Sequence, residues 1–555
     1  MAATKAKVSA NAKNALRAKR QAVRRERWHN RLQNWPWYAA LAEAFLLPLW
    51  HAGAEIALLF GVICLLVRAK ADKTFHFRHY RFDVPVILFL VIGAASIFVS
   101  PDPGFSFYNY YNLAIVYALT YFLISQVVRD TYQVRQLLAA IFGAGLLMIL
   151  YGFYQFIFGI DISSMKWVDG DAFPELRKRV FSTLENPNIL AGWLDMLICM
   201  AFGLFVQESS RKLKWLTGGF IVLAACCLAM TYARGAFFVI AVIFVGYGVL
   251  RDWRVLLGCV VVVAVLLMAD PVLYERLTTV FTKMDTSTEM RLAFWESTIA
   301  MIQDHPLLGI GWGAYWMVYP LYDFYIQGAA VKIVHAHNIY LNYAAEIGIP
   351  GAIAFFWYFF GTMVMSLRRR FEPGDPVPGR KRLFPSHLHN GWRAEVQQAW
   401  TEFCRWPEDR FLSGVMLGIG LSLISVALNG ITDDVLFNIP TSMFLWMTCG
   451  LAAAVAVMGK PGPDLTAKTI SRGKSLLSDL TKKAASGDKK PISGTEEKPV
   501  SEEKTSVSDG TPEPKDADEK EHVSEEAKND EGRNGRETGT GEENAGKNAE
   551  TADKK

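Results

Sequence analysis

Cysteine and charge are both scarce in this chain of 555 residues, and each scarcity excludes a class of protein. The seven cysteines lie in apolar segments or in a loop predicted to be cytoplasmic, and the only close pair, Cys226 and Cys227, is adjacent and not spaced as a chelate. We therefore expect neither a disulfide framework nor a zinc site. Only 20% of the residues are charged and 52% are hydrophobic, which excludes a set of ordinary soluble domains.

Large apolar side chains are almost absent from residues 459–555, where Lys, Glu, Asp, Ser, Gly and Asn dominate. This composition predicts a disordered, charged tail. Residues 1–35 contain ten Lys or Arg against one acid, Glu26, and lack the apolar stretch and cleavage site of a signal peptide. The remaining residues, 36–458, are predicted to form the membrane domain, with a long outer loop at 271–348.

The fold class that this pattern predicts is an all-α polytopic membrane protein. A bilayer core needs about 20 apolar residues in a helix. Twelve segments are candidates, of which the first two are short and could form one hairpin broken near Pro48. The segments are 37–50, 52–67, 84–100, 109–128, 136–158, 188–207, 214–230, 235–250, 254–271, 349–367, 411–430 and 437–458.

The distribution of Lys and Arg among the short loops predicts the orientation, because positive residues are retained on the cytoplasmic side. With the basic N-terminus inside, twelve crossings leave both termini in the cytoplasm. The basic loops that then lie inside are 68–81, 129–135, 211–214, 251–254 and 368–370. The loops that lie outside are 101–108, 161–187, 231–234, 271–348 and 429–437.

Arginine on the predicted outer side runs against this rule and therefore stands out. It occurs at 177 and 179, on either side of Lys178, and again at Arg234 and Arg291. Guanidinium groups bind phosphate oxygens through paired hydrogen bonds, so such a set suits a diphosphate-linked substrate. Two of them have a structural alternative, because Arg234 could snorkel from a helix end and Arg291 could stack on Trp295 or pair with Glu289.

Two histidines, His335 and His337, close the long outer loop. The residues after them read as a short helix with Asn338 as its N-cap and Gly348 at its end, and Pro350 suits the first turn of the next span. The helix dipole and nearby guanidinium groups should disfavour a second proton on His337, so that a neutral ring could act as a general base. The alternative is a loop histidine that only hydrogen-bonds the backbone.

The spacing from His337-Asn338 to Gly348-Ile349-Pro350-Gly351 resembles the signature of the O-antigen ligase family, membrane enzymes with a Wzy-type C-terminal domain. Ala352 stands where that family carries Gly, Thr or Tyr. The segment Asn186-Pro187-Asn188 and the stretch from Arg291 through Trp295 to residues 305–313 are also similar to the family. The resemblance covers roughly residues 35–458.

The resemblance implies a GT-C-like fold of about twelve transmembrane helices in the bacterial inner membrane, with a periplasmic active site. It implies a metal-independent, inverting glycosyltransferase without a cofactor. The donor would be a glycan on undecaprenyl diphosphate, and the acceptor lipid A-core or another surface molecule. The expected catalytic residues are His337, Arg234 and Arg291. The expected substrate-binding residues are Arg179, Arg177, Asn338 and His335.

Other functions stay open at this point. A related polymerase would extend a lipid-linked glycan, and a related oligosaccharyltransferase would attach it to Ser or Thr of a protein. A lipid-linked sugar transporter is a third possibility, but it predicts intramembrane charges, and the spans hold few beyond Glu43, Glu55 and Asp195. Membrane lipids are expected partners and nucleic acid is not, while the oligomeric state is not indicated.

Overall fold

The computed structural model describes residues 34–72, 75–159, 179–207, 211–269, 286–323, 333–368 and 410–458. Within these ranges all regular structure is helical and no strand occurs, which confirms the predicted all-α class. Residues 477–555 separate as a unit of their own. That unit, and with it the tail predicted to be disordered, lies outside the described residues.

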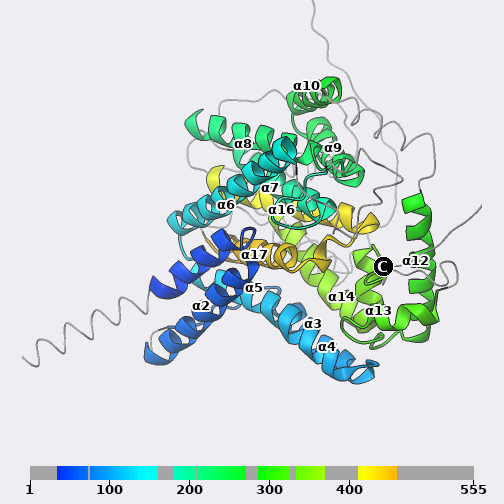
Figure 1. The fold of residues 1–555 in the computed structure, drawn as a ribbon. Helices are drawn as coiled ribbons and strands as arrows, with labels where there is room; N and C mark the ends of the chain where they lie inside the picture. The colour runs from blue at the N-terminus through cyan, green and yellow to red at the C-terminus, as the bar shows by residue number, and fades with distance from the viewer. Residues whose placement is uncertain are drawn as a thin grey trace, which may run out of the picture. The chain divides into compact units, whose positions relative to one another are not determined.

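Each of the twelve predicted apolar segments coincides with helix. The first is a helix over residues 34–46, and the others are named by the labels of Figure 1. They are α2 (His51–Ala71), α3 (Asp83–Ser96), α4 (Pro103–Tyr110) continued by α5 (Val116–Val127), α6 (Thr131–Phe158), α7 (Pro187–Gln207), α8 (Arg211–Ala229), α9 (Arg234–Leu250), α10 (Trp253–Ala269), α14 (Ile339–Arg368), α16 (Arg410–Thr432) and α17 (Ile439–Ala456). The predicted outer loop holds α12 (Thr286–Asp304) and the short α13 (Tyr315–Val318).

Seven of the described helices are long and apolar enough to cross a membrane, namely α2, α6, α7, α8, α14, α16 and α17. Three shorter apolar helices cover 83–99, 234–250 and 253–265. The chain is therefore a polytopic membrane protein. The count of twelve crossings and the GT-C-like architecture stay predictions.

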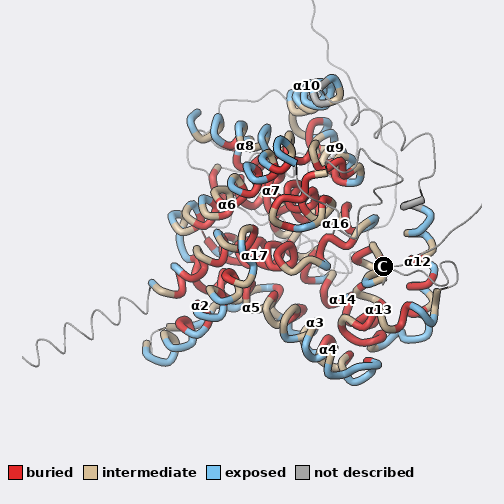
Figure 2. The backbone as a smooth tube through the Cα atoms, in the orientation of Figure 1, coloured by how far each residue is buried: buried red, intermediate tan, exposed pale blue. Residues whose placement is uncertain are grey.

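The most buried helices are α7, α16 and α17, which lie in the middle of the helical body (Figures 1 and 2). The pair α7 and α16 packs along a seam of small residues, in which Gly203 faces Gly414 and Gly418. A Cβ at Gly203 would overlap the backbone of both partners. Small residues at four-residue spacing let membrane helices approach closely, because dispersion and not the hydrophobic effect holds helices together in lipid.

Helices α2, α8 and α10 expose much of their apolar surface (Figure 2). On α10, for example, Val260 and Val261 are each more than half exposed. A soluble protein would not leave such helices uncovered, whereas lipid chains solvate them.

Two helix starts refine the sequence interpretation. Residues 47–49, including Pro48, form a turn between the first helix and α2, so the predicted break in the first pair is observed. Residues 101–108, predicted to be a loop, instead lie mostly in α4. The side chain of Asp102 accepts a hydrogen bond from the backbone N–H of Phe105 at 3.0 Å, and Pro103 occupies the first turn. An Asp-Pro pair of this kind starts a helix and does not interrupt one.

Candidate functional site

His337 lies in the short segment before α14, and its ring is held from two sides. The ring stacks on Phe294 of α12, with centroids 5.7 Å apart and planes at 21°. Its Nδ1 lies 3.0 Å from Oδ1 of Asp433, the residue that follows α16. The side chain is 34% exposed, so part of the ring remains accessible.

The backbone around His337 is unusual as well. His337 has a φ of +50°, which few non-glycine residues adopt. Among the described residues only Ser182, Glu185 and Tyr232 share this feature, and all three lie in the segments 179–186 and 231–233 that border the same site. Strained backbone of this kind persists where surrounding contacts fix it, and it concentrates at functional sites.

Asp433 is the centre of the charged cluster. Its Oδ2 accepts a hydrogen bond from Nδ2 of Asn188 at 3.1 Å and lies 4.0 Å from a guanidinium nitrogen of Arg291. Burial alone would favour the neutral acid, but the hydrogen bond from His337, the charge of that ring whenever it is protonated, and Arg291 lower the pKa of Asp433 well below its usual range. Asp433 is therefore a carboxylate at neutral pH.

Arg179 enters the cluster through Asn188. Its Nη2 donates to Oδ1 of Asn188 at 2.7 Å, and its Nε donates to the carbonyl of Thr231 at 2.8 Å. The amide of Asn188 thus links the guanidinium group on one side to the carboxylate of Asp433 on the other. Two of the NH groups of Arg179 are engaged by the protein, which fixes the plane of the guanidinium.

The Asn186-Pro187-Asn188 motif has a local explanation. Oδ1 of Asn186 accepts hydrogen bonds from the backbone N–H groups of Asn188 at 2.8 Å and Ile189 at 3.4 Å, so Asn186 is the N-cap of α7 and Pro187 occupies its first position. The cap starts α7 at the edge of the cluster. Asn188 is thereby placed to contact both Arg179 and Asp433.

The segment leading to this cap is anchored on α6. Gln155 accepts the backbone N–H of Ser182 at 2.6 Å and donates to the carbonyl of the same residue at 3.0 Å. The hydroxyl of Ser182 donates to the carbonyl of Met148 at 2.6 Å. These contacts fix the chain immediately after Arg179, so its position does not depend on Asn188 alone.

Arg234 is the first residue of α9, as its sequence position indicated. The next residue, Gly235, lies against α16, since a Cβ on it would be 3.6 Å from Oγ1 of Thr432, the neighbour of Asp433. The start of α9 therefore adjoins the cluster. Arg177, also predicted to bind substrate, lies outside the described residues.

Asn338 is the N-cap of α14, as predicted. Its Oδ1 accepts the backbone N–H groups of Tyr340 at 2.9 Å and Leu341 at 3.0 Å, and its Nδ2 donates to the carbonyl of Ile431 at 2.9 Å. Both ends of the amide are used within the protein. Asn338 thus ties the start of α14 to the end of α16 and sets the distance between His337 and Asp433.

His335 lies beside His337, with ring centroids 4.1 Å apart. Its Nδ1 accepts the backbone N–H of His337 at 3.2 Å, so this nitrogen carries no proton. Burial, together with the neighbouring His337 and Arg291, lowers the pKa of His335 to about 3 despite the opposing charge of Asp433. His335 is therefore neutral at physiological pH and supports the backbone of His337.

The glycine-rich stretch that follows His305 clamps the break in α14. Gly348 has a φ of +74° and separates two helical segments, the first of which ends there as predicted. The backbone N–H of Ile310 donates to the carbonyl of Ala345 at 2.8 Å, and that of Ile349 donates to the carbonyl of Pro306 at 2.9 Å. A Cβ at position 348 would overlap the carbonyl of Leu307, so glycine is required. The clamp holds α12, which carries Arg291, against α14.

The sequence interpretation missed the most connected residue of the site. Asp433 fell in a predicted outer loop, 429–437, and was given no role, and Asn188 was quoted only as part of a motif. The adjacent acids Asp433 and Asp434 next to an apolar span were the available signal. Three of the arginine and histidine candidates, Arg179, Arg291 and His337, are connected through Asp433 and Asn188.

A comparison with known families finds a match over part of the chain. Residues 219–356 match the family model described as O-antigen ligase, Wzy_C. The chain carries an O-antigen ligase domain. This confirms the resemblance seen in the sequence, and the matched residues include Arg234, Arg291 and His337. No match was found among curated proteins. The O-antigen ligase domain indicates ligase-type or polymerase-type transfer of lipid-linked glycans at a membrane.

Proposed function

We propose that this protein transfers a glycan from undecaprenyl diphosphate to an acceptor hydroxyl, with lipid A-core as the acceptor, at the periplasmic face of the bacterial inner membrane. The observation that carries the proposal is the contact of His337 with Asp433 inside a cluster that also holds Arg179 and Arg291. The O-antigen ligase domain, which spans residues 219–356, supports the same class of reaction.

The protonation pattern of the cluster suits a general base. Asp433 is ionised and can only accept hydrogen bonds, so Nδ1 of His337 must donate to it. In the neutral ring this leaves a lone pair on Nε2, which can take the proton of an acceptor hydroxyl. Asp433 then stabilises the imidazolium that forms, as the acid of a catalytic triad does.

The bond changes follow from this assignment. The acceptor oxygen attacks the anomeric carbon of the donor while its proton moves to Nε2 of His337. The bond from that carbon to the phosphate oxygen breaks, and the electron pair leaves with undecaprenyl diphosphate. A single displacement of this kind inverts the anomeric carbon. The guanidinium groups of Arg291 and Arg234 stabilise the charge that develops on the leaving diphosphate.

The arginines differ in how far the protein already engages them. Arg179 makes two hydrogen bonds to Thr231 and Asn188, so we assign it mainly to positioning Asn188 and Asp433. Arg291 lies at 4.0 Å from Asp433, an ion pair without hydrogen-bond contact, and its side chain is 26% exposed. Its donors can therefore rotate onto phosphate oxygens when the donor lipid binds.

The intramembrane acids favour transfer over transport. Asp195 of α7 accepts a hydrogen bond from Asn429 of α16 at 2.8 Å, and Glu43 accepts one from Thr120 of α5 at 2.8 Å. Both are buried contacts between neighbouring helices. Such pairs hold helices together in lipid, which gives Asp195 and Glu43 a structural role.

The acceptor is tested in a strain that lacks the gene. Bare lipid A-core together with accumulated polymeric undecaprenyl-linked glycan is the result expected for a ligase. Short, unpolymerised glycan would identify a polymerase instead. Unchanged lipopolysaccharide with unmodified secreted glycoproteins would identify a protein oligosaccharyltransferase.

The base is tested with purified protein and a defined undecaprenyl-diphosphate donor. His337→Ala should lower the rate of transfer by about 10³-fold, within the range of 10² to 10⁴ that general bases contribute. His305→Ala is the matched control, since His305 is an exposed histidine at the end of α12 and should retain full activity. Full activity in His337→Ala would refute its role as base.

A further inference from the structure

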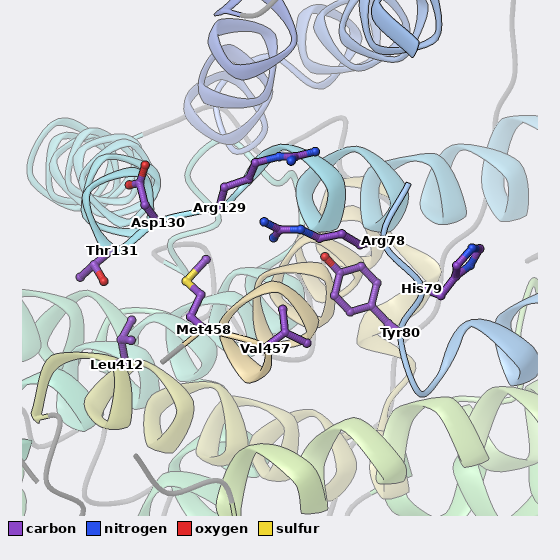
Figure 3. A pocket seen from close by; sticks show the side chains of 9 residues that line it. All are labelled: Arg78, His79, Tyr80, Arg129, Asp130, Thr131, Leu412, Val457 and Met458. Carbon is purple, nitrogen blue, oxygen red and sulfur yellow. The ribbon is translucent and has the colours of Figure 1, made fainter. Parts of the chain in front are cut away.

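A second set of basic residues surrounds a pocket on the predicted cytoplasmic face. The pocket has a volume of about 730 Å³ and lies where the chain before α3 meets the ends of α5, α6, α16 and α17 (Figure 3). Arg78 and Arg129 lie on one side of it, and Leu412, Val457 and Met458 form an apolar wall. It lies apart from the Asp433 cluster and shares no residue with it.

The backbone at Arg78 is fixed by Gln126 of α5. Gln126 accepts the backbone N–H of Arg78 at 2.8 Å and donates to its carbonyl at 2.8 Å. The hydroxyl of Tyr80 donates to the carbonyl of Ser125 at 2.6 Å. The wall that carries Arg78 is therefore a built part of the fold and not a loose loop.

Neither pocket arginine has a carboxylate partner among the described residues. Nη1 of Arg78 donates to the carbonyl of Val128 at 3.2 Å, and the guanidinium of Arg129 lies over the ring of Phe75, 5.1 Å from its centroid. The one acid that lines the pocket, Asp130, caps α6 by accepting the backbone N–H of Gln133 at 2.8 Å. Arg78 also hydrogen-bonds the side chain of Tyr80, so both arginines line the pocket while contacting only uncharged groups among the described residues.

The opposite wall has the chemistry of a lipid contact. Val457, at the end of α17, is 56% exposed although it is apolar, and the buried side chains of Met458 and Leu412 support it from the core (Figure 3). A ligand that satisfies both sides has an anionic head and an apolar body. Free phosphate would satisfy only the arginines.

We propose that this pocket binds the phosphate headgroup of an anionic phospholipid, with Arg78 and Arg129 on the phosphate and the acyl chains directed along the exposed Val457. Retention of positive charge on the cytoplasmic side explains why basic residues occur there. It does not explain a preformed pocket in which two arginines lack counter-charges. A bound anionic lipid supplies both the charge and the apolar surface.

The test uses the full-length protein in nanodiscs of phosphatidylcholine containing a small fraction of phosphatidylglycerol. Retained lipid is measured by native mass spectrometry after release from the disc. The pocket variant is Arg78→Gln/Arg129→Gln, and the charge-matched control is Arg211→Gln/Lys212→Gln, two exposed residues at the start of α8 on the same predicted face. Arg129→Gln alone serves as the milder variant, because the side chain of Arg129 makes no hydrogen bond within the described residues.

The wild type should retain phosphatidylglycerol over phosphatidylcholine, and the double pocket variant should weaken that binding about 30-fold, since each basic contact with an anionic lipid contributes about fivefold. Arg129→Gln should show about a fivefold loss by the same reasoning. The control should bind like the wild type. Equal losses in the pocket and control variants would overturn the proposal, because they would show a diffuse charge effect. Displacement of the lipid by millimolar inorganic phosphate would overturn it too, because the apolar wall would then contribute nothing.

Discussion

The two predicted faces of this protein hold arginine in different ways. On the outer face, Arg179 and Arg291 approach the side chains of Asn188 and Asp433. On the inner face, Arg78 contacts a backbone carbonyl and Arg129 an aromatic ring. Arg179 has a defined direction because two of its donors are bonded, to Thr231 and Asn188, whereas the side chain of Arg129 makes no hydrogen bond within the described residues.

This difference matches two functions of arginine, which are to position a reacting group and to attract an anion. A reacting group must be held to within a fraction of an ångström, and the cost of ordering it is paid by the protein's own contacts before substrate binds. The outer cluster has this character, since His337 is fixed by Phe294, Asp433 and the cap of α14 together. The inner pocket needs only to collect an anion, so it can leave its guanidinium groups less constrained.

The sharpest way to break the comparison is to remove the charge of Asp433. Asp433→Asn keeps the shape, but one of the two accepting oxygens becomes an NH2 donor. That NH2 must face either Nδ1 of His337, which would favour the wrong tautomer of the ring, or the donor Nδ2 of Asn188, which would disrupt the cluster. We expect the rate of transfer to fall by about 10²-fold or more, as in hydrolase triads. The variant should also change the dependence of the rate on pH, which a merely structural loss would leave alone. Asp304→Asn, an exposed acid at the end of α12, is the control and should keep the wild-type rate and profile.

A second change tests whether the outer cluster depends on the helix seam below it. Asn188 and Asp433 lie at the predicted outer ends of α7 and α16, and Gly203→Ala would force these helices apart where they touch. Overpacking of this kind costs about 1–3 kcal/mol, so the apparent Tm in detergent should fall and transfer activity should fall with it. Gly143→Ala on α6, where a Cβ meets nothing within 4 Å, should leave both unchanged. An unchanged Tm in Gly203→Ala would show that α7 and α16 accommodate the added methyl group without loss of stability.

The helices and the local geometry around His337 were predictable from the sequence because they depend on neighbouring residues. Runs of apolar residues mark helices in lipid, Asn338 marks a cap, and Gly348 marks a break, each within a few positions of its effect. The same local reasoning failed for residues 101–108, where Asp102 and Pro103 were taken for a loop although they start α4.

The contacts that make the site were not predictable, because they join distant parts of the chain. His337 and Asp433 are 96 residues apart, and Asn188 and Asp433 are 245 apart. Both contacts depend on which helices are neighbours. Hydropathy identifies apolar helices but does not indicate which of them pack together. Arginines that break the positive-inside rule could be noticed one by one. The acid that joins them gave no such signal, because acids on the outer face break no rule.

A third change compares the two kinds of arginine directly. Lysine cannot reach Thr231 and Asn188 together as Arg179 does, so Arg179→Lys should release Asn188 and lower the rate of transfer about tenfold, the equivalent of one charged hydrogen bond. Arg135→Lys is the matched change on the inner side, where the guanidinium lies over the ring of Phe411 at 3.9 Å and a lysine can keep that contact. It should retain wild-type activity. Equal activities in the two variants would remove the distinction between the faces.

The smallest expected effect concerns Asp434, which is buried next to the ionised Asp433. Burial, and then the charge of Asp433, raise the pKa of Asp434 from 3.8 to about 7. Between these two values the native protein holds a proton that the unfolded chain has released, so stability falls as pH rises through this range and is level above it. Asp434→Asn keeps an oxygen for the backbone N–H of Leu436 and removes the titration. The wild-type apparent Tm should therefore fall by roughly a few degrees relative to the variant between pH 5 and pH 8. Parallel Tm curves across that range would show that Asp434 titrates normally and is ionised through it, so that the outer cluster would carry one buried charge more than the raised pKa indicates.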